Sequence, residues 1–223
     1  QRAYDQVIHD VAIQNLHVVF CLDRGGVVGA DGPTHHGAYD LAYMRCIPNM
    51  VVAAPMDEVE LRNMMYSASQ LHNGPYSIRY PRGTGSIVDW KQPFEALPIG
   101  KGRRLQNGND IAILSIGAIG TQANEACEAL AQRGISAAHY DMRFAKPIDE
   151  MILHEVFGKF KHVITLEDGC IMGGFGSAVL EFMGDQGYQA QVRRLGLPDR
   201  YVEHGTQAEL YAENGYDAAS IVA

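Results

Sequence analysis

Residues 18–37, VVFCLDRGGVVGADGPTHHG, decide which fold the sequence predicts. The first four residues are apolar and polar residues soon follow, which is typical of a buried strand in a parallel sheet. The loop after it, residues 22–37, holds five glycines, an arginine, two aspartates and two histidines. Open α/β sheets bind ligands at the carboxyl ends of their strands, and glycines let the backbone approach a ligand closely. We therefore expect a binding or catalytic loop here, in preference to a surface loop with a chance pair of histidines.

The same succession of a short apolar strand and a helix recurs along the chain. Expected strands lie near 17–22, 50–54, 76–80, 111–114, 136–141, 163–166 and 190–195, and expected helices near 3–15, from 57 onward, 120–133, 149–158, 176–185 and 206–213. Regular alternation predicts parallel sheets with helices on both faces. Residues 84–98, rich in proline and glycine, are expected to be a linker. The predicted class is α/β, with two consecutive domains at 1–90 and 98–223.

Composition excludes several classes of protein. The 223 residues are 47% hydrophobic and carry a formal net charge of −8 without a basic run, which argues against a nucleic-acid partner. No apolar run approaches the roughly 20 residues of a membrane span, and no signal-peptide pattern opens the sequence. We therefore expect a cytoplasmic protein that does not contact a membrane. No spacing of His, Cys or Asp predicts a metal site, so no metal ligand is assigned.

The first residues predict a helix that has no N-terminal capping residue. Tyr4, Val7, Ile8 and Val11 fall on one helical face. No Ser, Thr, Asp or Asn precedes them as an N-cap. We therefore expect that the sequence is a piece of a longer protein.

Two arginines follow separate expected strands. Arg24 comes after strand 17–22, and Arg82 comes after strand 76–80. If these strands are neighbours, both guanidinium groups lie over one edge of the sheet. There they can bind a phosphate or carboxylate through paired hydrogen bonds. Taken singly, each arginine would be interpreted as one half of a surface ion pair.

Titratable side chains stand on the same loop. His35 can transfer protons near neutral pH. Asp31, four residues upstream, could orient this histidine or hold a substrate hydroxyl; alternatively it only caps a turn, since Asp-Gly is a turn dipeptide. Asp31 and His35 are the candidate catalytic residues. Because adjacent residues rarely face one site, His36 is given no role.

A glycine-rich turn, GGFGS at 173–177, precedes an expected helix. It is similar to a turn that binds phosphate at a helix N-terminus. Its spacing departs from Gly-x-Gly-x-x-Gly and no lysine follows. Close packing of the helix on the sheet explains the glycines equally well.

Seven motifs spread over the chain resemble one family. They are QRAYDQ (1–6), DRGG (23–26), GADGPTHHG (29–37), RCIPN (45–49), RYPRG (79–83), DMRFAKP (141–147) and GCIMGG (169–174). Together they resemble the 1-deoxy-D-xylulose-5-phosphate synthases, a branch of the transketolase-like enzymes whose members have three α/β domains. The resemblance implies that this chain carries most of the middle, pyrimidine-binding domain and the whole C-terminal domain.

The resemblance implies a transferase that depends on thiamine diphosphate and Mg²⁺. In this family the cofactor adds to pyruvate, carbon dioxide leaves, and the remaining unit is joined to D-glyceraldehyde 3-phosphate. The product, 1-deoxy-D-xylulose 5-phosphate, serves isoprenoid, thiamine and pyridoxal biosynthesis. A homodimer is implied as well.

The resemblance also implies roles for single residues. Arg24 and Arg82 bind the phosphate of the aldehyde, Asp31 and His35 line the substrate site, and Arg2 lies near the pyrimidine end of the cofactor. The family's diphosphate domain, its Gly-Asp-Gly metal motif and the glutamate that activates the aminopyrimidine find no match in this chain. We therefore expect the chain to need an N-terminal domain of the same polypeptide and to be inactive alone.

Two other classes of protein remain alternatives. The β subunit of a 2-oxo acid dehydrogenase has the same two-domain plan, but it uses no phosphorylated acceptor and so has no need of the arginine pair. A non-catalytic dimerisation module would keep the fold without needing Arg24, Asp31, His35 and Arg82. The presence of all four residues favours the synthase.

Overall fold

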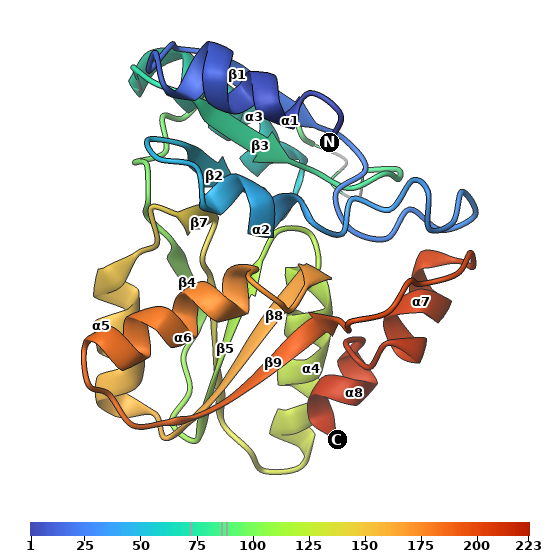
Figure 1. Ribbon diagram of the computed structural model, residues 1–223. Helices are drawn as coiled ribbons and strands as arrows, with labels where there is room; N and C mark the ends of the chain where they lie inside the picture. The colour runs from blue at the N-terminus through green and yellow to red at the C-terminus, as the bar shows by residue number, and fades with distance from the viewer. Residues whose placement is uncertain (72, 86, 88) are drawn as a thin grey trace.

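The computed structural model describes residues 1–71, 73–85, 87 and 89–223 and shows two α/β units stacked on one another (Figure 1). Each unit is built on one mostly parallel sheet with helices on both faces, which confirms the predicted fold class. The strands are β1 (Val19–Leu22), β2 (Val51–Ala53), β3 (Tyr76–Arg79), β4 (Arg103–Gln106), β5 (Ile111–Ile116), β6 (Ala137–Asp141), β7 (Phe144–Lys146), β8 (His162–Cys170) and β9 (Gln191–Leu197). The helices are α1 (Tyr4–Gln6), the π-helix η1 (Val7–Ala12), α2 (Asp40–Arg45), α3 (Glu58–Leu71), α4 (Gly120–Gln132), α5 (Glu150–Lys159), α6 (Phe175–Asp185), α7 (Gln207–Glu213) and α8 (Ala218–Val222).

The first sheet has the order β1-β3-β2-β7. β1, β3 and β2 run parallel, and β7 runs antiparallel to β2. Successive strand residues point to opposite faces. Val51 therefore joins the core cluster that contains Met64 of α3, whereas Val52 joins the cluster that contains Met44 of α2. Both faces of the sheet are thus covered at β2 and β3, whereas the edge strand β1 leaves Val19 and Cys21 exposed.

The second sheet has the order β4-β6-β5-β8-β9, in which only the edge strand β4 is antiparallel. Ile113 of β5 packs in the cluster that contains residues of α4, α7 and α8. Leu114, the next residue, packs in the cluster that contains residues of α5 and α6. This period of two places helices on both faces, as the alternation in the sequence predicts.

Four short elements were not predicted: α2, β4, β7 and α8. Strand β7 is three residues long and follows β6 after two residues, so in the sequence it is indistinguishable from a connection. Its partner β2 lies about 90 residues upstream and belongs to the other unit. The polar strand β4 lies at a sheet edge, where one side of its backbone faces solvent and no apolar alternation is needed.

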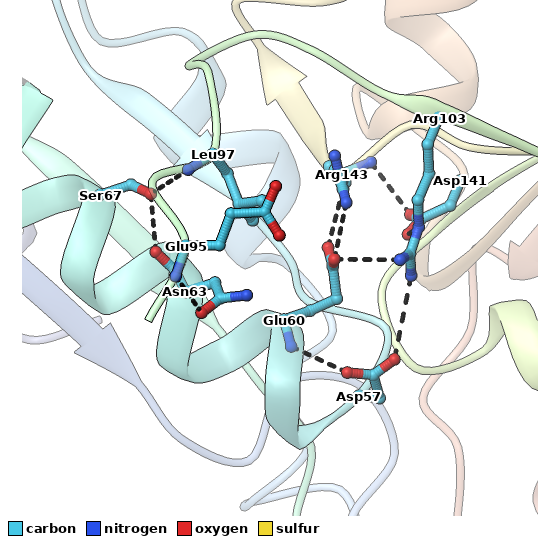
Figure 2. A network of polar contacts seen from close by, with 9 residues as sticks. All are labelled: Asp57, Glu60, Asn63, Ser67, Glu95, Leu97, Arg103, Asp141 and Arg143. Atoms are coloured by element: carbon cyan, nitrogen blue, oxygen red, sulfur yellow. Dashed lines mark hydrogen bonds and ion pairs between the residues drawn. The ribbon is translucent and has the colours of Figure 1, made fainter. Parts of the chain in front are cut away.

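Ion pairs reinforce the contact that β7 makes between the units (Figure 2). Arg143, just before β7, donates from Nε and Nη2 to the two carboxylate oxygens of Glu60 on α3, each at 2.7 Å. Arg103 of β4 lies between Glu60, at 3.1 Å, and Asp141, at 3.2 Å. Burial raises the pKa of Asp141 to about 6, and the positive charge of Arg103 opposes that rise. The two units are therefore joined by a strand and by a buried charge cluster.

The expected linker, 84–98, contains no helix or strand in its described residues; residues 86 and 88 lie outside them. Residues 90–97 run along α3 and form a strap. Arg62 donates from Nη1 to the carbonyls of Trp90 and Gln92, each at 2.7 Å. The amide of Leu97 donates to Ser67 Oγ at 2.7 Å, and Leu97 is buried (Figure 2).

We propose that the domains 1–90 and 98–223 meet in this strap. Limited trypsin digestion should cut at the exposed Lys91 and leave two stable fragments. Because β7 and the Arg143–Glu60 pair bridge the units, the fragments should elute together from a size-exclusion column in native buffer and separate only in urea. An uncut core, or fragments that separate without denaturant, would contradict the proposal.

Candidate functional site

Strands β1 and β3 are neighbours, so the loops that follow them leave the same edge of the first sheet. They pair in parallel with Leu22 opposite Arg79. The pairing continues into the loops, because the amide of Tyr80 donates to the carbonyl of Leu22 at 3.0 Å and the amide of Gly25 to that of Tyr80 at 2.9 Å. This arrangement is the condition under which the two arginines were expected to meet.

The structure brings Arg24, Asp31 and Arg82 together at this edge. Arg82 Nη1 donates a hydrogen bond to Asp31 Oδ2, and Arg24 Nε lies 3.9 Å from the same oxygen. The side chains of Arg24 and Arg82 are 46% and 49% exposed, and that of Asp31 is 30% exposed. We call these three residues the arginine clamp. It is a solvent-accessible point at which two guanidinium groups converge on one anionic oxygen.

Arg24 also has an unusual backbone, with φ of +58°. This left-handed conformation costs energy in any residue that has a Cβ, and such strain gathers at binding sites. A loop that served only as a connection would be expected to use glycine there.

The two histidines have different surroundings. His35 is exposed, and its Nδ1 lies 2.9 Å from the hydroxyl of Thr34. No hydrogen bond or ion pair joins it to the clamp in the described part of the chain. His36 is buried; its Nδ1 accepts from the amide of Val28 at 3.1 Å, which leaves Nε2 to donate to the carbonyl of Glu203 at 3.4 Å. His36 therefore has a structural role that the sequence did not suggest.

Arg2, expected near the cofactor, is exposed in the turn before α1. Among the described residues, no hydrogen bond or ion pair connects it to another side chain. Its role therefore stays a prediction.

The second unit holds the loop of the first through Asp168, at the end of β8. Asp168 Oδ1 accepts from the amide of Val27 at 3.1 Å and from the hydroxyl of Tyr216 at 3.1 Å, and Oδ2 accepts from Tyr211 at 3.2 Å. Burial raises its pKa to about 6, and the nearby Arg79 opposes that rise. The sequence carries a signal for Asp168, since it lies two residues after an expected buried strand, but that signal does not reveal its partner.

Arg79 itself is a buried connector between the units. Its Nε donates to Asp40 at 2.9 Å, and its Nη2 donates to the carbonyls of Gly37 and Asp168 at 3.1 and 2.7 Å. Burial of a charge is costly unless it is paired and fully hydrogen-bonded, and here these partners satisfy it. Arg79 thus fixes the end of the loop that carries the clamp.

Gln207, in the first turn of α7, ties the two clamp loops together. Its side-chain amide donates to the carbonyl of Val27 at 2.8 Å and to that of Arg82 at 3.3 Å. Because Gln207 is a neutral polar residue on a short helix, the sequence does not indicate that it connects the two loops. The spacing between the Arg24 loop and the Arg82 loop therefore depends on the second unit.

The glycine-rich turn at 173–177 is not a free phosphate site. The carboxylate of Glu167 accepts from the amides of Phe175 and Gly176, each at 2.8 Å. A Cβ on Gly174 would lie 2.2 Å from Glu167 Oε2, so close packing explains the glycine. Burial raises the pKa of Glu167 to about 7, and the two amides oppose that rise.

One chain of side chains resembles a hydrolase triad. Ser115 Oγ lies 2.8 Å from His139 Nε2, and His139 Nδ1 lies 2.8 Å from Asn124 Oδ1. Ser115 and His139 are fully buried, and burial lowers the pKa of His139 to about 4. The hydroxyl cannot reach a substrate, so this chain of hydrogen bonds is structural.

Within the described ranges, no three side chains of the His, Cys, Asp or Glu type come together as a metal site would require. No helix in the described part of the chain is both long and apolar enough to cross a membrane.

Comparison with known proteins agrees with this architecture. Residues 1–86 match the transketolase pyrimidine-binding domain, and residues 100–221 match the transketolase C-terminal domain. The curated relatives include the 1-deoxy-D-xylulose-5-phosphate synthases of Cytophaga hutchinsonii, 67% identical, and of Bacteroides fragilis, 59% identical, each over 99% of this chain. This chain spans only 35% and 34% of the length of those two relatives.

A solved structure has the same fold over both units. It is described as "Split gene transketolase, inactive beta4 tetramer", with a TM-score of 0.84 and 31% sequence identity, over 99% of this chain and 69% of that one. The predicted resemblance is thus confirmed at the level of fold and sequence. The chain belongs to the transketolase family and carries its pyrimidine-binding and C-terminal domains.

Proposed function

We propose that this chain is part of a thiamine-diphosphate-dependent synthase that condenses pyruvate with D-glyceraldehyde 3-phosphate to 1-deoxy-D-xylulose 5-phosphate and carbon dioxide. The observation that carries the proposal is the convergence of Arg24 and Arg82 on one accessible oxygen at the carboxyl edge of the first sheet. High identity to the synthases named above supports it. An acceptor with a phosphate explains why two arginines converge there.

We assign the acceptor's phosphate to the arginine clamp. Two guanidinium groups offer several N–H donors to the phosphate oxygens in a fixed geometry, which a lysine pair would not. His35, on the same loop, is proposed to hold or transfer a proton at the reacting oxygens of the substrate. Asp31 is proposed to line the same site, and Arg2 to lie near the cofactor's pyrimidine.

The described residues do not fit the diphosphate end of the cofactor. They offer no cluster of metal ligands, and Glu167 already occupies the amides that most resemble a phosphate cradle. We therefore derive no step through the cofactor in this chain. We propose that the diphosphate and Mg²⁺ are held by an N-terminal domain of the same polypeptide.

The wider assembly is also a proposal. We infer a cytoplasmic, magnesium-dependent homodimer, inactive as the isolated chain. Membership of the transketolase family supports the dimer, and a solved relative is itself described as an inactive tetramer.

The test is a product assay on the longer polypeptide that contains this chain. With pyruvate and D-glyceraldehyde 3-phosphate it should form 1-deoxy-D-xylulose 5-phosphate and carbon dioxide in equal amounts, and this chain alone should form neither. Acylation of lipoamide without the sugar phosphate would identify a 2-oxo acid dehydrogenase instead. No turnover with either acceptor would favour a dimerisation module.

A further inference from the structure

The proposed phosphate site already contains an anionic oxygen of this chain. We propose, on the basis of the proposed function, that Asp31 is an internal competitor for the arginine clamp. It makes the clamp select dianionic phosphate esters over monoanionic carboxylates such as pyruvate. The observation is that Arg24 and Arg82 both approach the same atom, Asp31 Oδ2.

The backbone of Asp31 is fixed, while its side chain is not. Asp31 lies in a turn closed by the amide of Gly32 and the carbonyl of Gly29, at 3.2 Å. Both glycines have left-handed φ values, and Gly29 packs against Gly205 of the second unit. The carboxylate is partly exposed and can therefore rotate into water when a ligand arrives. Because exposed ion pairs are weak, this displacement costs little.

The charges of the two kinds of ligand decide which one displaces Asp31. A monocarboxylate brings the same charge and the same two oxygens as Asp31, so it gains nothing by replacing it at the clamp. A phosphate ester brings a charge of about −1.5 to −2 and three acceptor oxygens, which satisfy both guanidinium groups better. Donor and acceptor substrates of the proposed reaction differ in this respect, because only the acceptor has a phosphate.

The experiment is a nuclear magnetic resonance titration of the 223-residue chain with inorganic phosphate and, separately, acetate at pH 8. The variant is Asp31→Asn, which keeps the shape and removes the charge; Asp31→Ser must give the same result. We expect Asp31→Asn to bind phosphate about 3- to 10-fold more tightly than the wild type, in line with the loss of two weak ion pairs. We also expect it to bind acetate, for which the wild type should show at least about 10-fold weaker binding than for phosphate.

The matched control is Asp23→Asn. Asp23 lies on the same loop, with Oδ2 4.0 Å from Arg24 Nη1, but no hydrogen bond or ion pair joins it to Arg82 within the described residues. The Asp23→Asn variant therefore measures how phosphate binding responds when one negative charge near the clamp is removed. The internal competitor would be overturned if Asp23→Asn tightened phosphate binding as much as Asp31→Asn does. It would also be overturned if Asp31→Asn did not tighten phosphate binding at all.

A further variant, Arg82→Ala, separates this inference from the proposed function. Arg82→Ala should weaken phosphate binding in the wild-type background. If it does so while Asp31→Asn leaves binding unchanged, only the internal competitor fails. If phosphate binding is indifferent to Arg82, or is absent in the wild type and in Asp31→Asn alike, the clamp itself fails and both proposals fall.

Discussion

Replacing Gly26 with alanine should reduce the free energy of unfolding by at least about 3 kcal/mol. Gly26 has φ of +84°, and a Cβ there would lie 1.9 Å from Asp168 Oδ2. Asp168 cannot move aside without breaking its hydrogen bonds to Val27, Tyr211 and Tyr216. The new methyl group must therefore displace the loop from the second unit. Urea denaturation of the 223-residue chain measures the change.

Gly134→Ala is the control for this substitution. Gly134 has nearly the same backbone, with φ of +78°, but nothing lies within 4 Å of its added Cβ. It should lose only the cost of a left-handed backbone, about 1–2 kcal/mol. If Gly26→Ala costs no more than Gly134→Ala, Asp168 does not hold the loop in place.

The meeting of Arg24 and Arg82 could be predicted because it follows from local rules. Each arginine comes after a short apolar strand, and parallel strands end at a common edge. The sequence does not show that the two strands are neighbours. The pairing of Leu22 with Arg79 in the structure shows that they are. Asp31 was expected beside them, but nothing in the sequence indicated that its carboxylate would lie between the guanidinium groups.

The supports of the clamp could not be predicted, because they act across long stretches of chain. Asp168 contacts Val27 from 141 residues downstream, and Gln207 does so from 180 residues downstream. Strand β7 is a similar case, since three residues from the second domain complete the sheet of the first. Neither the hydrophobic periodicity of the sequence nor the spacing of its motifs indicates contacts between residues so far apart in the chain. The expectation of two consecutive domains therefore missed how strongly the second domain shapes the site in the first.

Under the proposed function, Arg82→Ala, introduced into the longer polypeptide that contains this chain, should reduce kcat/KM for D-glyceraldehyde 3-phosphate. A charge-assisted hydrogen bond contributes roughly 1.5–3 kcal/mol, which corresponds to a loss of about 10- to 150-fold. The loop backbone should stay in place, because Gln207 holds the carbonyl of residue 82 and not its side chain. The kinetic parameters for pyruvate should change much less.

Arg104→Ala is the matched control for loss of an exposed, ion-paired arginine. Arg104 lies on the edge strand β4, pairs with Glu155 at 2.7 Å and is 49% exposed, as is Arg82. We expect no change in acceptor kinetics for this variant. A comparable loss in Arg104→Ala would attribute the effect of Arg82→Ala to general charge and not to the clamp.

The most direct test of the central claim compares two acceptors in the wild type and in Arg82→Ala. One acceptor is D-glyceraldehyde 3-phosphate, and the other is unphosphorylated D-glyceraldehyde. If Arg24 and Arg82 bind the phosphate, the variant loses kcat/KM for the phosphorylated acceptor by about 10- to 150-fold and changes little with the other. An equal loss on both acceptors would show that Arg82 is structural and would contradict the arginine clamp.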